Sequence, residues 1–175
     1  MILLVVAEEF DAGEVLADRT VARVDGTPRA AAALDAREVD AVVLSATPSE
    51  ALPLLRRLHG GEFGDPRVPV VVRTAEPLPE AFPLRPFDEV VSPREEGATG
   101  EAVARASAVA AYLDAVTDLY DACEERATGG VTDPLVEGAD VERLRDEADE
   151  RLDDLLSDPE VLAALLWTPG ESPDA

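Results

Sequence analysis

Short apolar runs recur along the first half of the chain. The first run, over residues 1–7, is apolar at every position, which is typical of a strand buried on both faces of a sheet. Further runs predict strands, and in chain order they cover residues 20–24, 40–45, 68–74 and 88–92. Strands without strict alternation of apolar and polar positions indicate a parallel sheet that helices cover on both sides.

Helix-like stretches separate these runs. Residues 28–36 are rich in alanine and begin with a proline, and residues 49–60 repeat leucine every third position before a glycine. Residues 76–87 contain four prolines, so at most a turn or two of helix is expected there. The alternation of strand and helix predicts an α/β fold with a five-stranded, parallel, doubly wound sheet.

From Gly100 onward the pattern changes to that of long helices. Within residues 101–127, small and apolar side chains stand alternately four and three positions apart, the spacing of a helix seam packed against another helix. A glycine-containing loop over residues 128–138 and a second helix capped by Asp140 complete a predicted helical hairpin. The expected apolar side of this second helix comprises Val141, Leu144, Ala148, Leu152 and Leu155.

The chain end carries one more signal. Residues 157–160 match a capping box with a proline in the first turn, and the apolar run 161–167 that follows is either buried or a docking surface. We therefore expect an α/β domain over residues 1–108, a helical module over residues 109–168 and a disordered tail over residues 169–175.

Composition adds the expected setting. The 175 residues contain 38 acidic and 15 basic side chains, giving a net charge of −23, and every basic residue is arginine because lysine is absent. A chain that repels itself so strongly is most easily kept compact in concentrated salt, where charges are screened over a few ångströms. The composition therefore predicts a cytoplasmic protein of a salt-accumulating halophile.

The same composition argues against several classes of function. Binding of nucleic acid needs a basic face, which 15 arginines among 38 carboxylates do not supply. No apolar run reaches the length of a membrane span, and the acidic start at Glu8 and Glu9 is unlike a signal peptide. A single cysteine, Cys123, forms neither an internal disulfide nor a metal cluster.

With these elements in place, the first two-thirds of the chain resemble the receiver domain of two-component response regulators, the CheY-like family. The segments that carry the resemblance are, in order, ILLVVAEE, DAVVLSATPSEALPLLRRL, PVVVRTA and DEVVSP. The resemblance implies that the carboxyl ends of the strands once formed a phosphorylation site, with an acidic pair for Mg²⁺, an acceptor aspartate, a switch hydroxyl and a lysine.

Carried over residue by residue, this chain keeps little of that site. Glu8 and Glu9 stand near the acidic pair, Ser45 replaces the acceptor aspartate, and Thr74 matches the switch hydroxyl. Ser92 replaces the lysine, although the proline after it is kept. An acyl phosphate needs a carboxylate, so we expect a vestigial pocket of Glu8, Glu9, Ser45, Thr74 and Ser92 with no resident cofactor. Binding of Mg²⁺ at the two glutamates stays open.

The C-terminal part resembles the HalX module that follows receiver domains in halophilic archaea. Residues 112–127 carry this likeness, which implies a helical signalling or interaction module. The residues expected to form its interface are Val109, Leu113, Val116, Tyr120, Cys123 and Trp167.

The sequence also argues against two enzymatic chemistries. A serine hydrolase would pair Ser45 with His59, the only histidine, but Ser45 lacks the flanking glycines of a nucleophile elbow, and His59 stands where a histidine contacts the last carbonyls of a helix. Asp40 stands at the start of its strand, at the opposite end of the sheet from the site, and so does not replace the acceptor. Neither nucleotide-binding glycine motif is present.

The sequence thus predicts a non-enzymatic pseudo-receiver, an adaptor that binds signalling proteins such as a sensor kinase or a regulator in two-component signal transduction. Two alternatives stay open. The first is an unconventional receiver or small enzyme that uses the strand-end pocket. The second is a helical homodimer with no role in signalling.

Overall fold

The computed structural model describes residues 2–6, 20–36, 39–63, 67–95, 97–128, 134–157 and 159, with the backbone alone at residues 2–6, 27 and 134–139. Contacts within the chain divide it into two compact units, Met1–Ala110 and Ala111–Ala175. Helix α4 (Ala98–Ala127) contributes its first part to one unit and its second part to the other. Each unit is described by itself.

The first unit is a mixed α/β structure with a parallel sheet, as predicted. Its strands are β1 (Ile2–Val6), β2 (Thr20–Val24), β3 (Ala41–Ser45), β4 (Val70–Arg73) and β5 (Glu89–Val91). They pair in the order β2-β1-β3-β4-β5, and every pairing is parallel. The valines of β3 and β4 favour a sheet with both faces covered, because β-branched side chains pack well on a pleated surface.

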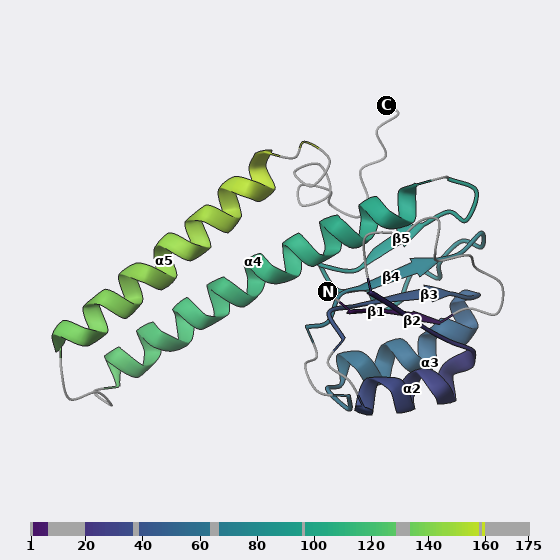
Figure 1. The fold of residues 1–175 in the computed structure, drawn as a ribbon, viewed down its shortest axis with the longest axis horizontal. Coiled ribbons are helices and arrows are strands. Elements are labelled where there is room, and N and C mark those ends of the chain that lie inside the picture. Colours follow the sequence, from purple (N-terminus) through teal and green to yellow (C-terminus); the bar gives the residue numbers. More distant parts are fainter. Residues whose placement is uncertain are drawn as a thin grey trace. The chain divides into compact units, whose positions relative to one another are not determined.

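Both faces of the sheet are covered. Helices α2 (Gly26–Ala36) and α3 (Pro48–His59) lie on one face, and the first part of α4 lies on the other (Figure 1). On the first face, the even-numbered residues of β3 and β4 pack against Leu54, Leu55 and Leu58 of α3. On the second face, the odd-numbered residues pack against the small residues of α4; these are Ala102, Val103 and Ala106.

The connection from β4 to β5 contains no helix, in agreement with its prolines. Its middle carries Phe82 and Leu84, which are partly buried against the core on the α3 face. Its end is fixed by Asp88, which precedes β5, and β5 is held to α4 by two bonds from the Arg105 guanidinium to the Glu89 carboxylate at 3.0 and 2.9 Å. Side-chain packing and polar contacts thus replace a crossover helix.

The second unit contains the rest of α4 and helix α5 (Pro134–Ser157), which run in opposite directions (Figure 1). The predicted apolar side of α5 is confirmed, since all five of its residues are buried or partly buried, with Leu155 only 2% exposed. The predicted loop over residues 128–138 is wrong from Pro134 onward, because α5 begins there. Proline suits a first helical position, and Gly138 costs only about 1 kcal/mol within a helix.

The predicted seam of α4 does not continue along the whole helix. From Ala111 on, the residues that are buried or partly buried include Tyr112, Ala115, Leu119 and Ala122. They stand one residue before the predicted seam positions, and one residue turns a helix by about 100°. The interval between apolar residues is therefore right and Leu113 is partly buried, but from Val116 on the face assigned to the helix contact is wrong.

Three sequence predictions fall outside the described residues. They are the acidic pair Glu8 and Glu9, the apolar run 161–167 with Trp167, and the tail 169–175. The predicted helix start at Ser157 is wrong, because Ser157 is the last residue of α5 and its hydroxyl donates to the Asp153 carbonyl at 2.8 Å. Among the described residues, no helix combines the length and apolarity that crossing a bilayer requires.

Candidate functional site

The carboxyl ends of the strands bring together most of the predicted pocket residues that the structure describes. Ser45 is the last residue of β3 and is the register partner of Arg73, the last residue of β4. Arg73 in turn is the partner of Val91 at the end of β5. Alternate residues of a strand point to one face, so Ser45 and Arg73 share the face of Val43 and Val71, where α4 packs.

Arg73 is the central side chain of this edge. One of its terminal nitrogens, Nη1, donates to the Ser45 hydroxyl at 3.2 Å, and the other, Nη2, donates to the Pro93 carbonyl at 3.0 Å. The guanidinium therefore links the end of β3 to Pro93, the second residue after β5. Burial lowers the pKa of Arg73 from its usual value, but an arginine keeps its charge in proteins.

The two other hydroxyls of the edge make local bonds. Thr74 is 9% exposed, and its hydroxyl accepts a bond from the Glu76 amide at 3.2 Å, while its own amide donates to the Val91 carbonyl at 3.0 Å. The hydroxyl of Ser92 accepts a bond from the Arg94 amide at 3.2 Å. Both residues thus shape the turns that follow their strands, as serine and threonine commonly do.

Helix α3 begins at the same edge. Glu50, in its first turn, accepts bonds from the Thr47 hydroxyl at 2.7 Å and from the Thr47 amide at 3.0 Å. The hydroxyl bond and then the amide bond hold the pKa of the Glu50 carboxyl below its usual value. A charged Glu50 also faces the positive end of the helix dipole.

Among the described residues, the carboxyl ends of the strands offer hydroxyls as possible ligands, whereas Glu8 and Glu9 lie outside the described ranges. Within the described ranges, no three of the histidine, cysteine, aspartate and glutamate side chains come together as metal ligands would. The chemistry that Ser45, Thr74 and Ser92 offer is that of neutral hydroxyls, which are weaker ligands for Mg²⁺ than carboxylates.

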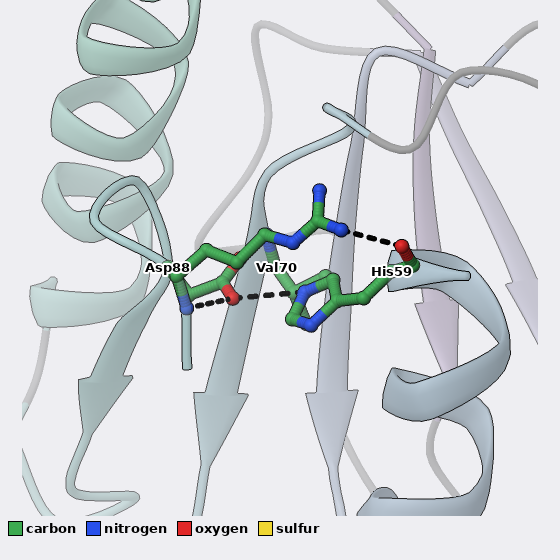
Figure 2. A network of polar contacts seen from close by, with 4 residues as sticks. His59, Val70 and Asp88 are labelled. Atoms are coloured by element: carbon green, nitrogen blue, oxygen red, sulfur yellow. Dashed lines mark hydrogen bonds and ion pairs between the residues drawn. The ribbon is translucent and has the colours of Figure 1, made fainter. Parts of the chain in front are cut away.

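A second polar cluster lies at the opposite edge, where the strands begin. Asp88 has no exposed side-chain surface, and its Oδ1 accepts from the Val70 amide at 3.0 Å while its Oδ2 accepts from the Arg85 amide at 2.8 Å. His59, at the end of α3, points its imidazole toward this carboxylate, as Figure 2 shows. The Arg85 guanidinium donates to the His59 carbonyl.

The histidine contact is close but is not an aligned hydrogen bond. His59 Nε2 lies 3.0 Å from Asp88 Oδ2, but it does not meet hydrogen-bond geometry. The two backbone amides are therefore the firm partners of the carboxylate. Arg85 also lies over the Phe87 ring, with 5.8 Å between guanidinium carbon and ring centroid. The cluster ties the end of α3, the start of β4 and the start of β5.

These positions rule out a pairing of Ser45 with His59. Ser45 ends β3, whereas His59 contacts Asp88 beside Val70 at the start of β4. Val70 and Arg73 are three residues apart on one strand, so the two edges are separated by roughly 10 Å. The expectation that His59 would contact the last carbonyls of its helix is also wrong, since its imidazole faces Asp88.

Sequence reasoning missed Arg73, Asp88 and Arg85. Arg73 had one signal, as a charged residue that closes an otherwise apolar strand. Asp88 and Arg85 had none, because their contacts to α3 depend on residues that are distant along the chain; Arg85 and His59 are 26 positions apart.

The predicted interface residues are distributed over both units. Val109 is 6% exposed within the first unit, and Leu113 is partly buried in the second. By contrast, Val116 is 36% exposed, Tyr120 is 68% exposed, and Cys123 is exposed as a free thiol. Open apolar surface on α4 thus begins at Val116.

Comparison with known proteins adds no further constraint. No protein-family model matches the chain, and no match was found among the curated proteins or the solved structures.

Proposed function

We propose that this chain is a receiver-like module that is not phosphorylated and that acts as an adaptor by binding other signalling proteins. The parallel sheet in the order β2-β1-β3-β4-β5 supports the proposal, because receiver domains use this doubly wound order. Ligand sites in such sheets lie at the carboxyl ends of the strands, where Ser45 and Arg73 are found.

The observation that carries the proposal is the Arg73 side chain between Ser45 and Pro93. A receiver transfers a phosphoryl group to a carboxylate at the end of its third strand. Here that position holds a hydroxyl, and the hydroxyl already accepts a bond from Arg73. No lysine exists in the sequence to stabilise the phosphoryl oxygens. The absence of an acceptor carboxylate at Ser45 and of a lysine supports a receiver-like module that is not phosphorylated.

Binding of a partner is the function that then remains for such a module, and α4 offers the surface. Val116 and Tyr120 stand four residues apart, so they are neighbours on the helix, and both are exposed. Exposed aromatic and aliphatic side chains of this kind are frequent anchors of protein interfaces. The proposed partner class is a sensor kinase or a regulator of a two-component pathway, in the cytoplasm of a halophile.

The first test asks whether the chain accepts a phosphoryl group. The full chain is incubated with acetyl phosphate and Mg²⁺ in concentrated KCl, beside an ordinary receiver domain as the positive control. Intact mass spectrometry should find no phosphorylated species of this chain. A stable or transient phosphorylated form that is lost on Ser45→Ala would contradict the proposal and favour an unconventional receiver.

The second test asks what the chain binds. The full chain and its Val116→Asp/Tyr120→Asp variant are used to capture proteins from a high-salt lysate of the native host. Thr117→Asp, an exposed change on the same helical turn, is the matched control. We expect a sensor kinase or regulator with the natural chain and the control, and its loss with the double variant. Recovery of this chain alone would overturn the adaptor and leave a self-associating helical protein.

A further inference from the structure

Arg73 occupies a place from which one side chain reaches two neighbouring strands. It lies between β3 and β5 in the sheet, as the register partner of Ser45 on one side and of Val91 on the other. Its two terminal nitrogens divide between these neighbours, since Nη1 donates toward β3 and Nη2 donates to Pro93, just after β5. The guanidinium is planar and rigid, so both bonds fix one relative position of the strand ends.

Backbone bonds at the same place depend on that position. The Thr74 amide donates to the Val91 carbonyl, which continues the pairing of β4 and β5 beyond Arg73. In the turn after β4, the Glu76 amide donates a hydrogen bond to the Thr74 hydroxyl. In the turn after β5, the Arg94 amide donates one to the Ser92 hydroxyl. Loss of the Arg73 bridge would allow these two turns to open.

A site controlled by a ligand needs two arrangements of similar free energy, of which the ligand prefers one. A cation that belongs to the chain cannot leave, and an arginine does not lose its proton in the accessible pH range. We propose that Arg73 is a resident cation that fixes the carboxyl ends of β3, β4 and β5 in one conformation, so that no bound ligand sets the state of this edge. The consequence for regulation rests on the proposed function: an adaptor whose strand ends are fixed in this way is always in its binding-competent state.

Amide hydrogen exchange of the full chain in concentrated KCl tests the inference. In Arg73→Ala, the amides of residues 74–76, 92, 94 and 95 should exchange roughly tenfold faster, as expected when about 1.4 kcal/mol of local stabilisation is removed. Amides within α3 should keep their rates. Arg94→Ala removes an exposed arginine at the same edge and is the matched control, for which rates at 74–76 should not change.

Two further variants keep the test valid if Arg73→Ala does not fold. Ser45→Ala removes one of the two bonds and should accelerate the same amides by about threefold, which is less than the effect of losing both bonds in Arg73→Ala. Arg73→Lys should restore part of the protection, because a lysine keeps the charge but not the fork that reaches both acceptors.

Addition of Mg²⁺ and acetyl phosphate to the natural chain should leave the rates at residues 74–76, 92, 94 and 95 unchanged. We call the bridge that Arg73 forms between Ser45 and Pro93 the clamp. Unchanged exchange in Arg73→Ala and Ser45→Ala would overturn the clamp, as would a change of exchange rates in the natural chain when the ligands are added. Capture of a partner is measured separately. If exchange behaves as expected and no signalling protein is captured, the clamp stands and the adaptor function fails. The opposite pair of results rejects only the clamp.

Discussion

At the amino edge of the sheet the central group is a carboxylate, Asp88, with no exposed side-chain surface; at the carboxyl edge it is a guanidinium, Arg73, which is only partly buried. Asp88 accepts bonds from two backbone amides, whose positions the chain itself determines. Arg73 donates to one hydroxyl and one carbonyl. A fully buried charge is expensive unless its partners are complete, whereas a partly exposed one retains some water.

The difference teaches where stability and function reside in this unit. At the amino edge, loss of either amide donor would leave the buried Asp88 carboxylate without a hydrogen-bond partner that it needs. The Arg73 guanidinium at the carboxyl edge is only partly buried, so water competes for its bonds, and such bonds stabilise less than those of a fully buried charge. We therefore expect changes at the amino edge to alter the free energy of unfolding, and changes at the carboxyl edge to alter local opening.

The largest effect is expected for Asp88→Ala. This change leaves the buried Val70 and Arg85 amides without their acceptor and His59 without its neighbour, which should lower the free energy of unfolding by about 3–5 kcal/mol. Urea unfolding in concentrated KCl measures it. Asp88→Asn, which keeps the shape and one good acceptor oxygen, should lose clearly less. Equal losses in both variants would contradict this expectation and assign the whole effect to the charge and the second acceptor oxygen, because asparagine leaves no cavity.

A smaller loss is expected for His59→Ala, of about 1–2 kcal/mol in the same measurement. The imidazole is close to Asp88 without an aligned hydrogen bond, and the carboxylate keeps both of its amide donors. The combination of His59→Ala with Asp88→Ala should cost less than the sum of the two, because the residues share one cluster. Strict additivity would contradict the description of the cluster as one unit.

At the carboxyl edge, Ser45→Ala should change the free energy of unfolding by about 0.5 kcal/mol or less. Arg73 retains its bond to the Pro93 carbonyl, and the lost partner is a partly buried hydroxyl. A loss comparable to that of Asp88→Ala would remove the contrast between the two edges.

The smallest effect is expected for Glu50→Gln at the start of α3. Because the bonds from Thr47 depress the pKa of Glu50 in the folded chain, the charged carboxylate adds stability above the pKa of the unfolded chain, and this contribution disappears as the pH falls through the folded value. Thermal unfolding of the natural chain and the variant should differ slightly near neutral pH and converge in acid. A constant difference across the range would assign the effect to something other than the charge.

The sequence was sufficient for the strands because their signal is local. Uninterrupted valine and leucine over a few residues specify a buried strand wherever it stands, so β3 and β4 were predicted to within about two residues. The prolines before β5 limited the expected helix to a turn or two, and the connection contains none. The apolar side of α5 was also readable, since every residue that defines it lies within that one helix.

The contacts between helices and strands could not be predicted from the sequence. Whether Arg73 reaches Ser45 depends on a pairing of residues 28 positions apart, and the pattern within each strand carries no record of it. The face of α4 in the second unit depended on its partner, so a seam of correct spacing was rotated by one residue. Pro134 was read as part of a loop because proline signals both a helix start and a break.

Hydrogen bonds hold the connection between β4 and β5 at both ends. The Thr74 amide donates to the Val91 carbonyl, and the Val70 amide donates to the Asp88 carboxylate. Between these points the turn at Glu80 and Ala81 is exposed, while Phe82 nearby is partly buried. Lengthening a loop whose ends are fixed costs little, about 0.6 kcal/mol for each doubling of its length. This turn is accordingly a suitable insertion point for an affinity tag or a fluorescent reporter, well separated in sequence from Ser45 and from the exposed face of α4.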